Sequence, residues 1–273
     1  MFSYLYDRFF IKKPIIRHFV TKLLEGDRNI RVDLFGCSIQ VNTLKEHGYL
    51  RASRMVKSSS LLRDEIPVLI HLASLLPSAD AFIDIGANVG IFSSSLSKLC
   101  QIFPHLVFYA FEANPDTFSR LQETVSDLPV KTHNLALGEN NGMLEFFGGA
   151  VSHVFTTVAN TSEYQYKKQE KILLPCRRLD SIDISGSRIV MKIDVEGQEL
   201  EVLRGAEDFF ESNRVMAVYL DGYKNPEVEN WLRRYGFDFW DGRSLKKIEG
   251  NVFSLLAIKN GINPPQLYKN VDA

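Results

Sequence analysis

The chain has 273 residues, of which 45% are hydrophobic, so it is long enough to bury one large α/β core or two small ones. Lys and Arg number 32 and Asp and Glu number 33, a formal net charge of −1, which excludes the strongly positive field of a general nucleic-acid binder. Three widely spaced cysteines without zinc-ligand spacing predict a reducing, cytoplasmic compartment, and the sequence has no apolar run of the roughly 18 residues that a membrane span needs.

The first 60 residues are predicted to form an N-terminal extension made of a helix and a short hairpin. The opening stretch is aromatic and basic, and two placements are open for it: packing on the domain, which the interruption at Pro14 favours, or contact with a membrane surface. Residues 30–42 alternate between apolar and polar side chains around Gly36, which is the pattern of a hairpin. A second unit is expected to cover residues 61–273.

From residue 61 the pattern becomes that of an α/β domain. A helix is predicted over 61–77, and apolar strands alternate with helices from there on. The predicted strands cover residues 81–85, 106–112, 130–137, 188–194 and 215–221. Consecutive β-α units indicate a doubly wound, mostly parallel sheet.

Two segments depart from this repeat. A polar, turn-rich insertion runs from residue 138 to about 183, contains the probable strand MLEFF, and is a candidate wall of a pocket. At the end of the chain, residues 237–242 and 251–260 are predicted as a terminal antiparallel pair. Between the fourth and fifth strands, a helix is expected to break or end near Gly205.

The segment FIDIGANVG follows the first predicted strand and contains Asp84, Gly86, Asn88 and Gly90. A strand-to-helix turn of this kind needs glycine for its φ freedom and for the close approach of a ligand. Its spacing fits neither a dinucleotide fingerprint nor a triphosphate loop. Asp84 would repel phosphate and attract an ammonium or sulfonium group. Glu112, at the end of the next strand, is placed to accept hydrogen bonds from both hydroxyls of a ribose.

These features resemble the class I S-adenosylmethionine-dependent methyltransferases. The segments FIDIGANVG, FYAFEANP, NLALGENNG, RRLDSI and MKIDVEGQELEVLRGA resemble the FkbM family in particular, in order over about residues 62–221. The resemblance implies an S-adenosyl-L-methionine cofactor, a Rossmann-like class I methyltransferase fold, and commonly O-methylation of sugars in polysaccharides and glycolipids or of secondary metabolites. It implies that Asp84, Gly86, Asn88 and Gly90 surround the amino-acid half of the cofactor and that Glu112 binds its ribose.

The same resemblance places Asn114 beside the adenosine. Many class I enzymes carry an acid after the third strand for the adenine amino group, but this chain has none there, so Asn134 or a backbone carbonyl is expected instead. The family often ends its fifth strand with Glu and a nearby His, whereas this chain has Asp221 and no His. We expect Asp221 to face the substrate.

The segment KIDVEG carries Lys192, Asp194 and Glu196 at alternate positions where the fourth strand ends. Ligands of open parallel sheets bind at the carboxyl ends of the strands. Methyl transfer from a sulfonium needs in-line alignment, and a hydroxyl acceptor must also lose its proton. We predict that Asp194 is the general base, whose pKa neighbouring carboxylates would raise. Glu196 is either a second catalytic carboxylate or a cap of the following helix.

Three further residues are candidates for the substrate side. Lys192 is expected to pair with Asp194 or Glu196, because an unpaired buried ammonium is costly. His153, in the insertion, is a second candidate base, although a loop His is more often surface decoration. Tyr223 is one of several aromatic residues that could stack on a sugar ring or simply pack. The acids could instead hold a divalent metal, but the expected downstream pairing is absent and we predict no metal.

The resemblance to the FkbM family therefore favours an O-methyltransferase that acts on a sugar hydroxyl. Three alternatives stay open: an O-methyltransferase of a small secondary metabolite, a non-catalytic partner subunit with the same fold, and a nicotinamide oxidoreductase. The near-neutral charge and the absence of an Asn-Pro-Pro-aromatic base-flipping motif make nucleic-acid methylation the least favoured activity.

Overall fold

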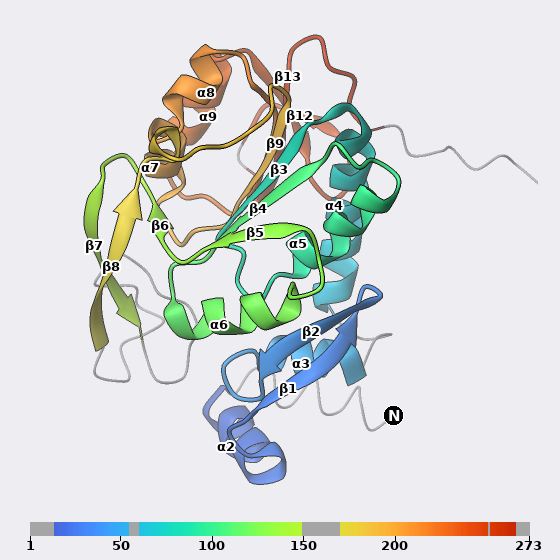
Figure 1. Cartoon of the computed structure of the whole chain (residues 1–273), viewed down its shortest axis with the longest axis vertical. Coiled ribbons are helices and arrows are strands. Elements are labelled where there is room, and N and C mark those ends of the chain that lie inside the picture. Colours follow the sequence, from blue (N-terminus) through green and yellow to red (C-terminus); the bar gives the residue numbers. More distant parts are fainter. Residues whose placement is uncertain (1–13, 55–59, 149–169, 251, 266–273) are drawn as a thin grey trace, which may run out of the picture.

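The computed structural model describes residues 14–54, 60–148, 170–250 and 252–265 of the chain, and the candidate base His153 lies outside them. An eight-stranded sheet forms the centre of the molecule and carries helices on both faces (Figure 1). Its strands lie in the order β12-β11-β13-β10-β9-β3-β4-β5. They are β3 (Ala81–Ile85), β4 (Val107–Phe111), β5 (Val130–His133), β9 (Ile189–Ile193), β10 (Val215–Asp221), β11 (Phe237–Asp241), β12 (Lys247–Ile248) and β13 (Ser254–Lys259).

The pairing of these strands confirms the predicted doubly wound, mostly parallel sheet. Strands β5, β4, β3, β9 and β10 run parallel to their neighbours, and β13 lies antiparallel between β10 and β11. The chain starts the sheet at β3, builds outward through β4 to β5, and then returns to place β9 on the other side of β3. This reversal opens a crevice at the carboxyl ends of β3 and β9, where ligands of such sheets bind.

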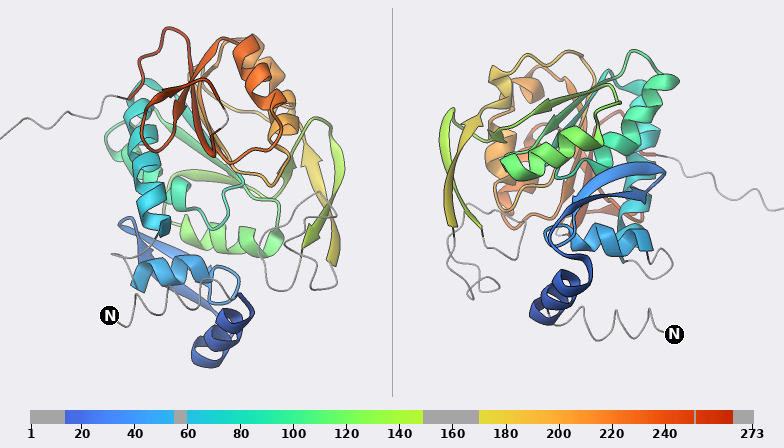
Figure 2. Two further views of the ribbon diagram at one scale, coloured as in Figure 1. Left: turned by 180° about the vertical axis from the view of Figure 1, so that it is seen from behind. Right: turned by 60° about the horizontal axis from the view of Figure 1, so that its bottom comes forward.

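Each face of the sheet is covered by its own set of helices (Figures 1 and 2). Because side chains alternate along a strand, every second residue faces one set. One set is α4 (Ser60–Leu75), α5 (Ile91–Leu96) and α6 (Pro115–Thr124), with short 3-10 turns at Leu76–Ser78 and Ser97–Gln101. The other is α7 (Glu199–Arg204), α8 (Glu207–Glu211) and α9 (Glu227–Arg234), preceded by a 3-10 turn at Leu179–Ser181.

A separate three-stranded sheet stands beside the central one and contains β6 (Ala136–Leu137), β7 (Gly142–Gly148) and β8 (Glu170–Arg177) in the order β6-β8-β7. The single strand predicted over 130–137 is therefore wrong: β5 ends at His133, and the chain starts a new sheet three residues later. Sequence analysis also assigned the segment of β8 to a polar insertion and so missed this strand. Strand β7 pairs antiparallel with β8 from Glu170 to Cys176.

The N-terminal part consists of α2 (Pro14–Glu25), an antiparallel hairpin of β1 (Asn29–Leu34) and β2 (Cys37–Asn42), and α3 (His47–Arg54). The hairpin lies against α5 and α6, on the side of the molecule opposite to β13 (Figure 2). Its buried residues Val32, Leu34, Ile39 and Val41 belong to the same hydrophobic cluster as α4, α5 and one face of the central sheet. The hairpin therefore extends the main core instead of forming one of its own.

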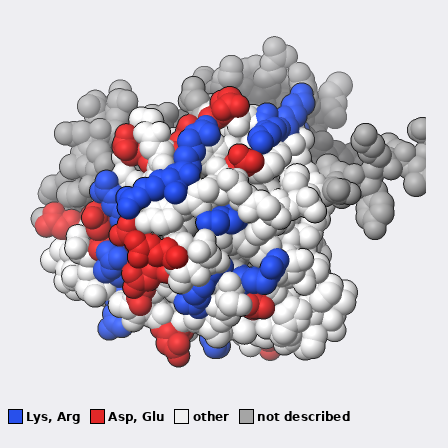
Figure 3. All heavy atoms as spheres, turned by 90° about the horizontal axis from the view of Figure 1, so that it is seen from above, with Lys and Arg blue, Asp and Glu red and all other residues white. Residues whose placement is uncertain are grey.

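The surface gives no sign of a single dominant charge on the face seen from above, where acidic and basic side chains lie next to one another (Figure 3). In the part of the chain that the structure describes, no helix has both the length and the hydrophobicity of a transmembrane segment.

Candidate functional site

A cavity of about 340 Å³ opens at the crevice that the sheet topology predicts. Four strand ends contribute to its lining, through Gly86 after β3, Glu112 after β4, Asp194 after β9 and Asp221 at the end of β10. Apolar side chains from the small sheet form another wall: Leu137, Leu144, Phe146 and Leu174. The carboxyl ends of parallel strands and the insertion after them thus enclose one space.

The glycine loop owes its shape to close contact with the neighbouring strand. Gly86 has a φ of +73°, and a Cβ added there would lie 2.0 Å from the backbone oxygen of Asp194. Gly90 has a φ of +88°, and a Cβ there would lie 2.6 Å from a methyl group of Leu121 on α6. Only glycine fits both positions without displacement of the backbone or the core. Gly86 lines the cavity, and Gly90 instead packs the loop onto α6.

Backbone amides hold the carboxylate of Glu112 at the rim of the cavity. One oxygen accepts a hydrogen bond from the N–H of Asn88 at 3.0 Å, and the other accepts from the N–H of Asn114 at 2.9 Å. Burial raises the pKa of Glu112 to about 7, although these two N–H groups oppose the rise. Each oxygen keeps a lone pair for a further donor. The arrangement fits a carboxylate that receives two ligand hydroxyls.

Two of the three predicted asparagines line this end of the cavity, and Asn134 is not among the lining residues. Asn88, with a φ of +51°, lines it and has a buried side-chain oxygen without a hydrogen-bond partner. Asn114 caps α6 by accepting hydrogen bonds from the N–H groups of Asp116 and Thr117, and it also lines the cavity. Asn134 is exposed, and its amide nitrogen donates to the backbone oxygens of Glu112 and Ala113, both of which line the cavity.

Lys192 connects strands β3 and β9 behind the cavity. Its register partner on β3 is Asp84, so both side chains emerge on the face that α5 covers. The ammonium donates to the backbone oxygen of Gly86 at 2.8 Å and lies 3.3 Å from a carboxylate oxygen of Asp84 and 3.4 Å from one of Asp194. Burial alone would lower the pKa of Lys192, but Asp84, Asp194 and Asp221 outweigh it and raise the pKa, so the ammonium stays charged.

Asp84 itself lies beneath the glycine loop and is fully buried. One of its oxygens accepts hydrogen bonds from the backbone N–H and the hydroxyl of Ser93, at 3.2 and 2.7 Å. The residues that line the cavity include neither Asp84 nor Lys192. Asp84 and Lys192 together fix the loop between β3 and α5. Asp84 was expected to contact the cofactor and Lys192 the substrate, but neither is among the residues that line the cavity.

Asp194 faces the cavity directly, with 39% of its side chain exposed. Burial is the main cause that raises its pKa, and Asp221 and Asp84 add to the rise, whereas Lys192 opposes it. Neighbouring carboxylates were expected to raise the pKa of Asp194, and they do, but desolvation raises it more. A partly desolvated carboxylate with a raised pKa beside a glycine loop is a suitable proton acceptor.

Glu196 also lines the cavity, where its side chain is exposed. The carboxylate that accepts a backbone hydrogen bond at the start of α7 is that of Glu199, from the N–H of Gly197 at 2.9 Å. Burial raises the pKa of Glu199 to about 7. Tyr223 is not among the lining residues, and its hydroxyl donates to Glu229 on α9. Of the predicted substrate residues, Asp221 is the one that reaches the cavity.

Several lining residues were not predicted from the sequence, among them Tyr49 on α3, Glu65 on α4 and Phe253 before β13. Tyr49 precedes the segment of about residues 62–221 that resembles the family, and both Tyr49 and Glu65 precede the glycine-loop motif that begins at Asp84. Within the described ranges, no group of three or more His, Cys, Asp or Glu side chains has the arrangement of a metal site.

Comparison with known proteins gives one family and several relatives. A model of the methyltransferase FkbM domain matches residues 84–239. Hexuronic acid methyltransferase AglP of Haloferax volcanii is 28% identical over 169 residues, which are 61% of this chain and 66% of that protein. Methyltransferase sdnD of Sordaria araneosa is 26% identical over 204 residues, which are 62% of this chain and 78% of that protein.

Among solved structures, a TehB-like S-adenosylmethionine-dependent methyltransferase from Corynebacterium glutamicum has a TM-score of 0.41 and 12% identity, and the match covers 78% of this chain and 97% of that one. The family match is the decisive one, since it begins at Asp84, ends within β11 and includes both the glycine loop and the KIDVEG segment. As it spans more than half of the chain, this protein belongs to the FkbM methyltransferase domain family.

Proposed function

We propose that the protein transfers a methyl group from S-adenosyl-L-methionine to a hydroxyl group of a sugar in a polysaccharide or glycolipid. The observation that carries this proposal is the position of Asp194, a cavity-facing carboxylate that follows β9 immediately beside the glycine loop. The name of the relative AglP, a hexuronic acid methyltransferase, supports a sugar as the acceptor.

The described residues fit the cofactor that the family implies. Glu112 would accept hydrogen bonds from the ribose hydroxyls, because its oxygens are held by two backbone N–H groups and border the cavity. The unpartnered, buried oxygen of Asn88 would accept from the ammonium of the amino-acid half. Asn134 would direct its carbonyl oxygen to the adenine, since its nitrogen is already used by two backbone carbonyls. When bound, the cofactor supplies an electrophilic methyl group on a sulfonium.

The acidic residues then perform the proton chemistry of the acceptor. Asp194 would accept the proton of the acceptor hydroxyl, which makes the oxygen a nucleophile as it approaches the methyl group. Lys192 would keep the Asp194 carboxylate in position through its 3.4 Å ion pair, while the second pair with Asp84 anchors the ammonium. A base must be ionised to accept a proton, so turnover should fall as the pH drops through the raised pKa of Asp194.

We place this reaction in the cytoplasm. The three cysteines, Cys37, Cys100 and Cys176, are all free thiols, and Cys37 and Cys176 are buried. Unpaired cysteines are typical of a reducing compartment, which supports the location.

The test is incubation of the purified protein with methyl-labelled S-adenosylmethionine and glycan fractions of the source organism, followed by mass spectrometry. We expect label in a sugar O-methyl group. Parallel reactions with polyketide acceptors would reveal a secondary-metabolite enzyme, and calorimetry with NADH would reveal an oxidoreductase. Binding of S-adenosylmethionine without transfer to any acceptor would favour a non-catalytic partner subunit and overturn the proposal.

A further inference from the structure

The N-terminal part of the chain contributes polar groups to the cavity. Tyr49 from α3 and Glu65 from α4 line the same space as Asp194 and Asp221, which come from the ends of β9 and β10. The four groups are near enough to influence one another: Glu65 and Asp194 both act on the titration of Tyr49, and Asp221 acts on that of Glu65. Tyr49 and Glu65, which form the N-terminal wall of the cavity, lie outside the segment that matches the family model, because that segment starts at Asp84.

The alternation of side chains explains why these groups meet. Asp84, Lys192 and Tyr219 are register partners across β3, β9 and β10, and they emerge on the face that α4 and α5 cover. Asp194 and Asp221 follow two residues later on the same side, so they come out beneath the N-terminal segment. We call the part of the cavity around Tyr49, Glu65, Asp194 and Asp221 its acceptor end. Helices α3 and α4 line this end, and the helices of the other face do not.

The charged side chains among the described residues that line the cavity are all acidic. Among the described residues that line it, none is Lys, Arg or His, and five are acids: Glu65, Glu112, Asp194, Glu196 and Asp221. The nearest buried ammonium, that of Lys192, is already engaged with three oxygen atoms. An acceptor carboxylate or phosphate beside Asp194, Glu196 and Asp221 would meet like charges, with no Lys, Arg or His among the described lining residues to pair with it, which is unfavourable. Hydroxyl groups can donate to the carboxylates at no such cost.

Glu65 supplies the complementary donor. Its Oε2 is buried without a hydrogen-bond partner, and burial, followed by Asp221, raises the pKa of Glu65 to about 8. At pH 7 the group is therefore mostly protonated and can donate. The charged and titratable groups that act on it or on which it acts are Asp194, Asp221, Lys192, Arg243, Tyr49 and Tyr219.

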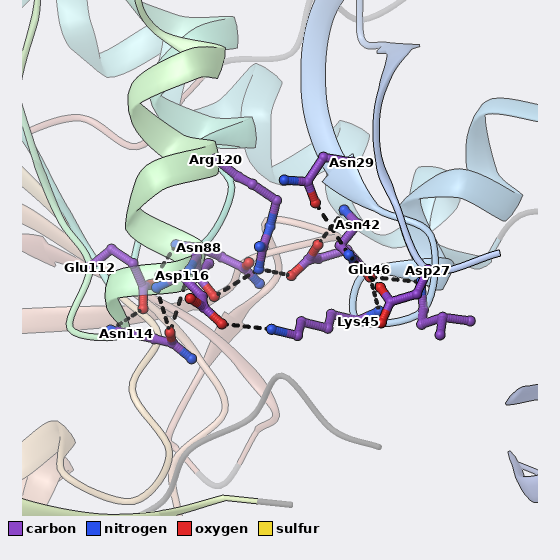
Figure 4. A network of polar contacts seen from close by, with 12 residues as sticks. Asp27, Asn29, Asn42, Lys45, Glu46, Asn88, Glu112, Asn114, Asp116 and Arg120 are labelled. Carbon is purple, nitrogen blue, oxygen red and sulfur yellow. Dashed lines mark hydrogen bonds and ion pairs between the residues drawn. The ribbon is translucent and has the colours of Figure 1, made fainter. Parts of the chain in front are cut away.

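A buried ion pair positions this wall on the cofactor-binding part. Arg120 of α6 lies 2.7 Å from Oε1 of Glu46, and their side chains are 4% and 0% exposed. The backbone oxygen of Glu46 accepts hydrogen bonds from the N–H groups of Tyr49 and Leu50, which start α3. Figure 4 shows the network running from Glu112 and the capped start of α6 through Arg120 to Glu46 and the hairpin. Helix α3, which carries Tyr49, is thus fixed to the helix that follows Glu112.

From these observations we propose that Tyr49 and Glu65 bind the acceptor, and that this acceptor is an uncharged sugar, in contrast to the hexuronic acid named for the relative AglP. The inference rests on the proposed sugar O-methyltransferase function and adds the substrate class and two residues. The hydroxyls of Tyr49 and protonated Glu65 hold the sugar, and the carboxylates of Asp194 and Asp221 accept from its hydroxyl groups.

The first experiment identifies the methylated sugar. The glycan fraction that takes up label is hydrolysed, and the labelled monosaccharide is identified by mass spectrometry. A second portion of the same acceptor is reduced at its carboxyl groups to neutral sugars before the reaction. We expect a methylated uncharged sugar and undiminished labelling after reduction. A methylated uronic acid, or labelling lost on reduction, overturns this inference alone, whereas no labelled sugar in any fraction overturns the proposed function.

The second experiment tests the two residues with that fraction as acceptor. Glu65→Leu and Tyr49→Phe should each raise the acceptor KM about tenfold, while calorimetry shows the Kd for S-adenosylmethionine unchanged within twofold. Glu65→Gln keeps a donor and should retain the wild-type KM at pH 7. Wild-type activity should decline as pH rises through about 8, because deprotonated Glu65 no longer donates, and Glu65→Gln should lack this decline.

The matched controls are Glu123→Gln on the exposed side of α6 and Tyr235→Phe, whose hydroxyl donates to Glu207; none of these three residues lines the cavity. Both should leave KM unchanged. An unchanged KM in Glu65→Leu and Tyr49→Phe, or a decline of activity at alkaline pH that persists in Glu65→Gln, overturns the assignment of these residues.

Discussion

The two ends of the cavity are built in different ways. At the cofactor end, one short stretch from Asp84 to Asn114 provides the loop, the acid and the helix cap, and backbone N–H groups hold Glu112. At the acceptor end, Tyr49, Glu65 and Asp194 come from distant segments: Lys192 holds Asp194, and the ion pair of Arg120 with Glu46 anchors the segment that leads to Tyr49. The first end depends on backbone geometry and the second on particular side chains. Substitutions at the first should therefore change cofactor affinity, and those at the second should change turnover and acceptor affinity.

The largest effect is expected at the acceptor end, from Asp194→Asn. Because the amide cannot accept the hydroxyl proton, kcat should fall about a thousandfold, while the Kd for S-adenosylmethionine changes little. Initial rates with labelled cofactor and calorimetry measure the two quantities. Asp208→Asn, at an exposed position on α8, is the matched control and should leave both unchanged. Wild-type turnover in Asp194→Asn would remove the assignment of Asp194 as the base.

The next effect concerns the contact between the two ends. Glu46→Gln leaves the buried guanidinium of Arg120 without its carboxylate, and the free energy of unfolding should fall by roughly 3 kcal/mol. Urea denaturation measures this change. The double variant Glu46→Leu with Arg120→Met replaces both charges by apolar groups, so it should lose less stability than the single variant. If the single variant is as stable as wild type, the N-terminal part is not anchored through this pair.

A smaller effect is expected at the cofactor end, from Glu112→Gln. Loss of the charge weakens hydrogen bonds to the ribose hydroxyls, so the Kd for S-adenosylmethionine should rise tenfold to a hundredfold, roughly 1.5–3 kcal/mol. The acceptor KM and kcat at saturating cofactor should stay near wild type. Glu123→Gln, on the neighbouring helix α6, controls for the lost charge. A raised acceptor KM with unchanged cofactor affinity would show that the two ends are not separate.

The difference between the two ends of the cavity also determines how much of each end could be predicted from the sequence. The positions of Gly86 and Glu112 at the cavity could be predicted because both residues stand at fixed spacings along one βαβ unit, so that local pattern and final position are coupled. Strand periodicity likewise predicted the parallel sheet and its antiparallel end. Both depend on short-range regularities of the chain.

Asp194 and Asp221 were predicted at the strand ends, but the contribution of Tyr49 and Glu65 to the acceptor end could not be predicted, since it depends on tertiary contacts. Glu65 lies in a helix with ordinary amphipathic spacing and reads as one of its solvated charges, so nothing local indicates that it faces a cavity. Lys192 was expected to pair with Asp194 or Glu196, and the structure adds Asp84, which only the register between β3 and β9 brings opposite to it. Glu196 was expected either to act in catalysis or to cap the following helix. The carboxylate that accepts a hydrogen bond from the N–H of Gly197 is instead that of Glu199, three residues later.

The smallest effect is expected from Lys45→Met, which removes an exposed ion pair beside the buried one. Lys45 lies 2.7 Å from Asp116, but their side chains are 43% and 67% exposed, so water and salt screen the attraction. The free energy of unfolding should fall by about 0.5 kcal/mol or less, and 0.5 M NaCl should abolish the difference from wild type. Both pairs join the N-terminal part to α6, so burial is the variable that separates them. A loss as large as that of Glu46→Gln would mean that the docking of the two parts depends on surface charge, and the acceptor wall would then be sensitive to salt.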